Sequence, residues 1–122
     1  MRLVIVESPY APKDATSTED FAKKIALHEV YARAAMKDCL RRGEAPYASH
    51  LLYTQPGVLD DMVSAERSLG IEAGLAWGKK ADATVVYEDL GLSGGMLLGI
   101  ATAKAERRPV EMRRLGENWA DD

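Results

Sequence analysis

The chain has 122 residues, of which 47% are hydrophobic, and its formal net charge at pH 7 is -3. This length suits one compact domain spanning residues 1–122, and the charge lacks the excess of Lys and Arg that a duplex nucleic acid partner requires. The apolar run near the N-terminus is too short for a signal peptide or a membrane span. We therefore expect a cytoplasmic protein with no membrane or duplex nucleic acid partner.

The first half of the chain predicts a strand, a long helix and a second strand. Residues 2–6 are a short β-branched run typical of a buried strand, and a proline-containing loop follows. Ser17 is a suitable cap for a helix expected from about residue 18 to residue 42, and Gly43 is a natural stop. A short second strand is expected at Glu44–Tyr47.

The middle of the chain predicts a loop followed by a second helix. The loop "ASHLLYTQPG" is expected after the second strand, and the helix is expected from Val58 to Lys80. Glycines recur every fourth residue in this helix, at Gly70, Gly74 and Gly78. Such a face lets another backbone approach closely, either from a partner helix in a homo-oligomer or from elements of the same chain.

The last third of the chain continues the alternation of strands and helices. Residues 83–90 predict a third strand, residues 93–108 a third helix and residues 109–115 a final strand. Strands that alternate with helices form a parallel sheet with right-handed crossovers. The sequence therefore predicts an α/β fold with a parallel sheet of about four or five strands and helices on both faces.

In an open parallel sheet, ligands bind outside the carboxyl ends of the strands. The helix predicted after the third strand begins there with Ser93, Gly94 and Gly95. Its free backbone N–H groups and partial positive charge suit a phosphate or carboxylate, although a glycine-rich turn without a ligand has the same sequence. His50, in the loop after the second strand, is a candidate phosphate donor.

Acidic and aromatic residues are expected at the same end of the sheet. Either Asp89 or its neighbour Glu88 should face the site, because side chains alternate along a strand. A carboxylate there could accept bonds from a ribose or act as an acid or base. The rings expected to stack on a base, or simply to pack at the rim, are Tyr10, Tyr47, Tyr53 and Tyr87. One cysteine and two separated histidines do not indicate a metal site, and no cofactor is expected.

Three stretches together resemble the nucleoside 2-deoxyribosyltransferase-like superfamily, which includes small proteins of phages and bacteria. They are "LVIVESPYA", "RRGEAPYASHLLY" and "DLGLSGGMLLGIATAKAERRPV". The first is similar to the opening strand and Gly-Pro-aromatic loop, with Ser8, Pro9 and Tyr10 in the loop and serine in place of glycine. The resemblance implies a flavodoxin/Rossmann-like three-layer sandwich, a nucleoside or nucleotide ligand, and a homo-oligomer.

The chain departs from this superfamily where its transferases carry a nucleophilic glutamate. The matching position holds Leu97, or Leu98 with a shift of one residue, and neither can attack an anomeric carbon. One hypothesis is therefore a binding protein, such as a phage protein that sequesters a nucleotide immune signal. The alternative is an enzyme acting on an N-glycosidic or phosphoester bond through Glu7 and Asp89. A third hypothesis is an interaction protein with no small ligand.

Overall fold

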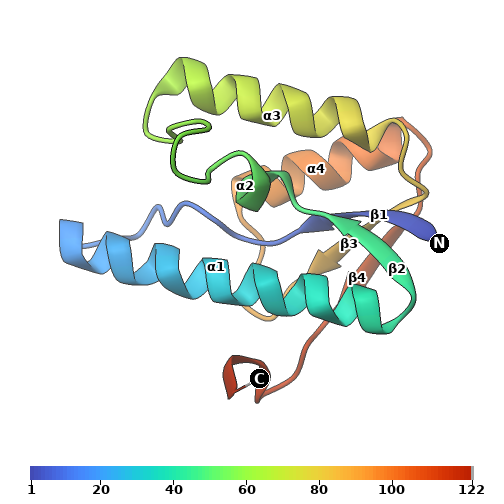
Figure 1. Ribbon diagram of the computed structural model, residues 1–122, viewed down its shortest axis with the longest axis horizontal. Coiled ribbons are helices and arrows are strands. Elements are labelled where there is room, and N and C mark those ends of the chain that lie inside the picture. The colour runs from blue at the N-terminus through green and yellow to red at the C-terminus, as the bar shows by residue number, and fades with distance from the viewer. Residues whose placement is uncertain (122) are drawn as a thin grey trace.

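The computed structural model describes residues 1–121 and confirms the α/β fold with a parallel sheet. The four strands are β1 (Arg2–Glu7), β2 (Glu44–Tyr47), β3 (Ala83–Tyr87) and β4 (Val110–Arg113). The helices are α1 (Thr18–Arg41), α2 (Ser49–Leu52), α3 (Ser64–Gly78) and α4 (Gly94–Ala105), followed by a short 3-10 helix, η1 (Trp119–Asp121). Helices cover both faces of the sheet, as in flavodoxin-like sandwiches (Figure 1).

The strand order is β2-β1-β3-β4, and every neighbouring pair is parallel. From β1 the chain first crosses to β2 on one side and then returns to β3 on the other side. The carboxyl ends of β1 and β3 therefore flank a topological switch point, where the crossover connections leave in opposite directions. Open α/β sheets bind ligands at such a point.

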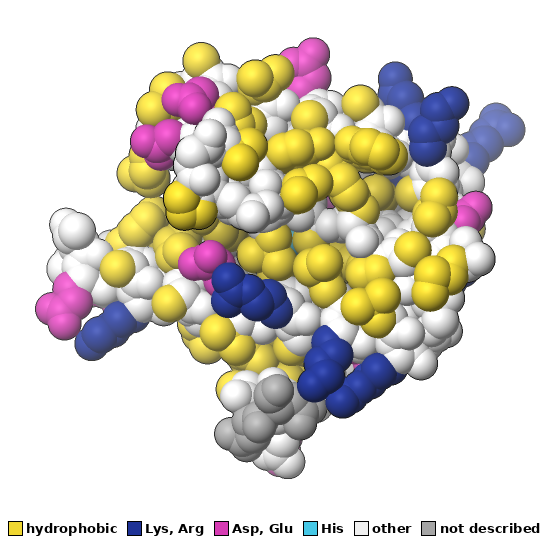
Figure 2. Space-filling model, in the orientation of Figure 1, with side chains coloured by type: hydrophobic (Ala, Val, Ile, Leu, Met, Phe, Trp, Pro, Cys, Tyr) yellow, Lys and Arg dark blue, Asp and Glu magenta, His cyan; other side chains and the backbone are white. Residues whose placement is uncertain are grey.

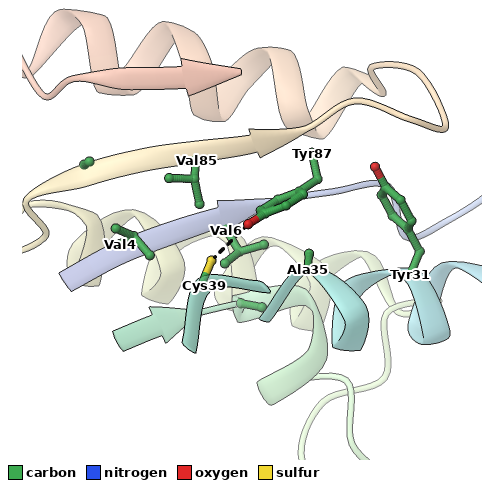
Figure 3. Close-up of a cluster of buried hydrophobic side chains, with 9 residues drawn as sticks. Val4, Val6, Tyr31, Ala35, Cys39, Val85 and Tyr87 are labelled. Atoms are coloured by element: carbon green, nitrogen blue, oxygen red, sulfur yellow. Dashed lines mark hydrogen bonds between the residues drawn. The ribbon is translucent and has the colours of Figure 1, made fainter. Parts of the chain in front are cut away.

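Helix α1 covers one face of the sheet and begins at the predicted cap. The Asp20 amide donates to the Ser17 hydroxyl oxygen at 3.0 Å, and Gly43, with a φ of 81°, allows the chain to turn after the helix. The helix buries Tyr31, Ala35 and Cys39 against strand residues of β1 and β3, which Figure 3 shows pointing toward one another. Burial of these apolar side chains is the main stabilising contribution on this face.

Helices α3 and α4 lie on the opposite side of the sheet from α1 (Figure 1). All five residues of β3 are buried, because helices cover both faces of this central strand. Helix α4 contributes Met96 and Ala103 to the buried interior. Within residues 1–121, none of the helices combines the length and the apolar character needed to cross a membrane.

Several elements differ from the sequence prediction. The second long helix begins at Ser64 and not at Val58, because Asp60 diverts the chain into a turn: its carboxylate accepts the Met62 amide at 2.9 Å, and its own amide donates to Glu66 at 3.1 Å. The segment predicted as a loop after β2 contains α2. The third strand ends at Tyr87, since a turn closed by the Gly91 amide follows it.

The glycine face of α3 packs inside the chain, which excludes the close approach of a partner helix along it. A β-carbon on Gly74 would lie 2.7 Å from the Ser49 hydroxyl oxygen, and one on Gly70 would lie 3.4 Å from Leu59. At Gly78 the nearest group is the Arg108 guanidinium, at 3.2 Å. These glycines let α2, the following loop and Arg108 lie against the helix, so they give no support to an oligomer.

A charged network ties the outer strands together on the α1 face. Arg113 of β4 donates from both terminal nitrogens to the two carboxylate oxygens of Glu44 on β2, each at 2.8 Å. Both side chains are buried, with exposed fractions of 6% and 8%. Arg2 donates to Glu44 at 3.2 Å and also pairs with Glu111. The bidentate geometry of the Arg113–Glu44 pair is the strong form of a charged hydrogen bond.

Candidate functional site

A cavity of about 160 Å³ lies at the carboxyl ends of β1 and β3, the switch point of the sheet. Its walls come from the end of β1, the loop after β1, and helices α2, α3 and α4. Polar and charged residues among its lining include Glu7, Ser8, Lys13, His50, Arg67 and Ser93. The structure therefore brings together most of the residues that the sequence placed in a ligand site.

The N-terminus of α4 forms one wall of the cavity. The Met96 amide donates to the Ser93 hydroxyl oxygen at 3.3 Å, so Ser93 caps the helix as expected. Gly94 and Gly95 follow, are exposed, and line the cavity. Because the first backbone N–H groups of a helix have no acceptor within the helix, this end attracts anions.

Lys13 adds a full positive charge at the same helix end. Its ammonium nitrogen lies 3.1 Å from the position that a β-carbon on Gly94 would occupy. Lys13 was not predicted from the sequence, since the path of the loop after β1 decides where this side chain lies. The one feature of the sequence that could have pointed to it is the presence of a lysine in the segment that directly follows β1. Lysine and helix end together favour an anionic group at Gly94 and Gly95.

Glu7 ends β1 and places its carboxylate against the backbone of α4. A β-carbon built on Gly99 would overlap this carboxylate, so Gly99 provides the space that Glu7 occupies. Burial raises the pKa of Glu7 to about 8, and the Arg108 guanidinium opposes this rise only in part. Arg108 has other partners, the Gly78 carbonyl at 2.7 Å and Glu106 at 2.6 Å. Glu7 is therefore largely uncharged at neutral pH.

His50 and Ser8 form a second polar group in the cavity. The His50 Nε2 atom and the Ser8 hydroxyl oxygen are 2.7 Å apart, and the Tyr10 ring meets the His50 ring edge-on at 6.3 Å. His28 Nδ1 donates to the Tyr10 carbonyl, which holds this loop on α1. Burial, with a smaller contribution from His28, lowers the pKa of His50 to about 4. His50 is thus a neutral cavity-lining group at neutral pH.

Several of the predicted site residues lie outside the cavity: Pro9, Tyr47, Tyr53, Tyr87 and Asp89. Pro9 is buried in the loop after β1, and Tyr87 lies in the core beneath α1. Asp89 accepts bonds from the Tyr31 hydroxyl at 2.6 Å and from the Leu115 and Gly116 amides at 2.9 and 3.1 Å. Burial acts to raise the pKa of Asp89, but these bonds together lower it. Asp89 fastens the C-terminal segment to α1, so of the two candidate catalytic acids only Glu7 lines the cavity.

The two leucines of α4 are partly exposed rather than packed as interior residues. Leu97 is 53% exposed and Leu98 is 48% exposed, and Leu98 lines the cavity. Neither leucine is a core residue of the domain. On a helix whose buried side faces the sheet, these positions point toward solvent and the cavity mouth. Leu98 therefore gives the cavity an apolar wall at this point.

We expect Leu97→Glu to change the free energy of unfolding by no more than about 0.5 kcal/mol, because an exposed side chain on a helix tolerates substitution. Urea unfolding of the variant beside the parent protein measures this difference. A loss of several kcal/mol would show that Leu97 is packed in the folded protein.

A larger groove adjoins the cavity. It has a volume of about 570 Å³ and lies between the start of α1 and the loop before α3. Tyr10 and Asp61 line both spaces, so they mark the boundary between them. The apolar lining of the groove includes Phe21, Ile25, Leu59 and Met62. The sequence analysis missed this groove, because it depends on the turn that Asp60 imposes.

Within residues 1–121, no three His, Cys, Asp or Glu side chains are grouped so that they could hold a metal ion. The single thiol, Cys39, is buried beneath α1, where burial raises its pKa. Its sulfur lies 3.3 Å from the Tyr87 hydroxyl (Figure 3). The chemistry of the cavity therefore rests on Glu7, His50, Lys13 and the N-terminus of α4.

These features define a parallel-sheet α/β domain with a polar cavity at its switch point. The chain belongs to a family described as a domain of unknown function, DUF7768, whose model matches residues 2–113. The match extends from β1 to the end of β4 and so includes the whole cavity. No curated protein matches the chain.

Proposed function

We propose that this protein binds a nucleotide or a nucleoside derivative in the switch-point cavity. The observation that carries the proposal is the convergence of the Lys13 ammonium with the N-terminus of α4 beside Gly94 and Gly95. A phosphate matches a helix end next to a lysine, because both contribute positive potential. The resemblance of three sequence stretches to the nucleoside 2-deoxyribosyltransferase-like superfamily supports the same ligand class.

Tyr10 indicates how such a ligand would be oriented in the site. Its ring stands between the polar cavity and the apolar groove, so a ligand with its phosphate at α4 can extend its base along Tyr10. Aromatic rings stack on nucleobases of any sequence, with a favourable contribution of about 1–3 kcal/mol per base. Ser8 and His50 provide hydrogen-bonding groups between these two ends.

In this proposal the ligand is retained intact. Leu98 stands on the wall where the superfamily carries its attacking glutamate, and an aliphatic side chain cannot form a covalent glycosyl intermediate. Tight retention without turnover suits a protein that sequesters a nucleotide signal, such as an immune signal that a phage protein removes.

Incubation with nucleosides, nucleotides and cyclic nucleotides, followed by chromatography of the mixture, tests the proposal. Recovery of an intact nucleotide from the denatured complex is the expected result. If no compound of the panel is retained and none is converted, the proposal fails, and a stable assembly without a small ligand then favours an interaction protein.

We expect Gly94→Val to weaken binding of the retained nucleotide at least about tenfold, because the new side chain fills the space between the helix end and Lys13. Ser93→Ala should cost about 1 kcal/mol, the typical net value of one neutral hydrogen bond. Ala101→Val is the matched control, since Ala101 is exposed on the same helix. Calorimetric titration measures all three, and unchanged affinity in Gly94→Val would place the site elsewhere.

A second candidate function is an enzyme that cleaves a nucleotide at an N-glycosidic or phosphoester bond. Glu7 favours it, because a buried carboxylic acid that keeps its proton at neutral pH is a suitable general acid. The incubation above separates the two functions. Free base, ribose or released phosphate indicates an enzyme, and its loss in Glu7→Gln would assign the reaction to this side chain.

We also expect a homo-oligomer, because large apolar side chains are exposed over the α3 and α4 side of the chain. Trp77 is 57% exposed, Leu69 is 55% exposed, and Figure 2 shows hydrophobic side chains gathered over this part of the molecule. Extended apolar patches of this kind mark interaction surfaces. Light scattering at micromolar concentration should give at least twice the mass of one chain, and a monomer mass would contradict the expectation.

A further inference from the structure

We propose that Glu7 binds the ligand as an uncharged acid, donating a hydrogen bond to a ligand oxygen, and thereby makes the cavity selective for anionic ligands. This inference rests on the proposed function, because it concerns the same cavity. It adds the residue that decides which ligand charge the cavity accepts.

The carboxyl group of Glu7 lies between the end of β1 and helix α4. Glu7 extends from the end of β1 toward α4, and Gly99 leaves open the space into which the carboxyl group reaches. Within residues 1–121, no side chain or amide donates a hydrogen bond to it. Its oxygens face the cavity and thus have their hydrogen-bonding capacity free for a ligand.

The surrounding charges decide which form of Glu7 suits a ligand. Lys13, Arg67 and Arg108 line the cavity as cations, whereas Asp61 at its border with the groove is the other acid among the lining residues. Such a surrounding disfavours a cationic ligand and favours an anionic one. An ionised Glu7 would oppose that preference, and an uncharged Glu7 does not.

The groups that face Glu7 leave it protonated at neutral pH. Arg108, which follows α4, acts to lower the pKa of Glu7, but it is bonded to the Gly78 carbonyl, Thr84 and Glu106. His50 on α2 is neutral there, and α3 contributes Arg67 beside Ile71, Leu75 and two glycines. Burial therefore controls the carboxyl group, and its pKa of about 8 keeps the proton available for donation.

Gly94 and Gly99 are five residues apart on α4, which separates the helix end from Glu7 by about 7.5 Å along the axis. An anion at the helix end and a negative charge on Glu7 would repel one another across that distance in a partly dehydrated cavity. The expected effect on affinity is about tenfold. Ionisation of Glu7 should therefore weaken binding of any anion at α4.

Sodium sulfate is a suitable probe, because its charge is constant between pH 6.5 and pH 9. Its affinity is measured by calorimetric titration at constant ionic strength. We expect the parent protein to bind sulfate about fivefold more weakly at pH 9 than at pH 6.5, because anion binding itself raises the pKa of Glu7. Glu7→Gln, which keeps a donor and cannot ionise, should bind equally at both values.

Glu7→Met removes the donor while keeping the shape, and it should bind more weakly than the parent at pH 6.5. Glu72→Gln is the matched control, because Glu72 is exposed on α3. Thermal melts of each variant establish that it is folded. An equal pH dependence in the parent and Glu7→Gln, or no sulfate binding at pH 6.5, would overturn the inference.

The outcomes also separate this inference from the proposed function. Nucleotide binding with no effect of Glu7 on the pH dependence would refute the role of Glu7 alone. Sulfate binding that responds to Glu7, with no nucleotide retained, would refute the nucleotide proposal and leave an anion site.

Discussion

Glu44→Ala is expected to lower the free energy of unfolding at pH 7 by about 3 kcal/mol, the largest effect that we predict for one substitution. The Arg113 guanidinium, 6% exposed, would lose both of its bonds to the Glu44 carboxylate. Its remaining partners, Glu111 and the Tyr87 hydroxyl, replace only part of that interaction. Most of the cost arises because a buried charge is left without its counter-ion.

Urea unfolding measures this loss. Glu72→Ala, on the exposed side of α3, is the control and should change stability by no more than about 0.5 kcal/mol. The double variant Glu44→Leu with Arg113→Met should recover most of the loss, since it removes both charges. A loss below about 1 kcal/mol in Glu44→Ala would mean that the pair is solvated, as surface pairs are.

The Arg113–Glu44 pair also makes the free energy of unfolding depend on pH in the acid range. The hydrogen bonds from Arg113 lower the pKa of Glu44 below its ordinary value of 4.5. Because the folded state then releases this proton more readily than the unfolded state, the contribution is present above pH 4.5 and is lost as the pH falls below it.

Glu7→Gln is expected to remove a loss of stability that the parent protein shows between pH 6.5 and pH 8. The pKa of Glu7 is about 8 in the folded state against 4.5 ordinarily, so the folded protein retains a proton that the unfolded chain releases. Stability therefore falls as the pH rises through this window, by about 1.4 kcal/mol per pH unit and about 2 kcal/mol in total.

The titration of His50 is the reason that the comparison begins at pH 6.5 and not lower. Its pKa is lowered from 6.5 to about 4, so its contribution falls as the pH drops below 6.5 and offsets that of Glu7 there. Urea unfolding of the parent and Glu7→Gln at pH 6.5 and pH 8 isolates Glu7, because all other groups are common to both. Parallel losses in the two proteins would show that Glu7 ionises normally.

Much of the fold follows from local sequence signals. The β-branched run of residues 2–6, the Ser17 cap and the stop at Gly43 each predict an element that the structure confirms. The beginning of α3 was not predictable, because it depends on a turn made by the Asp60 carboxylate. The glycines of α3 were ambiguous, since only the tertiary structure determines that α2 covers Gly74.

The candidate site was predictable where it depends on sheet topology. The loop after β1, His50 and the start of α4 converge because the carboxyl ends of parallel strands share one edge. The position of Asp89 was not predictable, because side-chain alternation alone could not choose between Glu88 and Asp89. Asp89 lies outside the cavity because it accepts a hydrogen bond from the C-terminal segment. Lys13 depends on the path of an irregular loop, for which the sequence carries no periodic signal.

The central claim is that the N-terminus of α4 holds the phosphate of a nucleotide. A titration of the amide spectrum with each nucleotide of the panel tests it most directly. For at least one nucleotide, we predict saturable shifts that are largest at Gly94 and Gly95, with no shift at Gly43, which ends α1 and is not part of the cavity lining. No saturable shift at Gly94 or Gly95 with any nucleotide would contradict the claim.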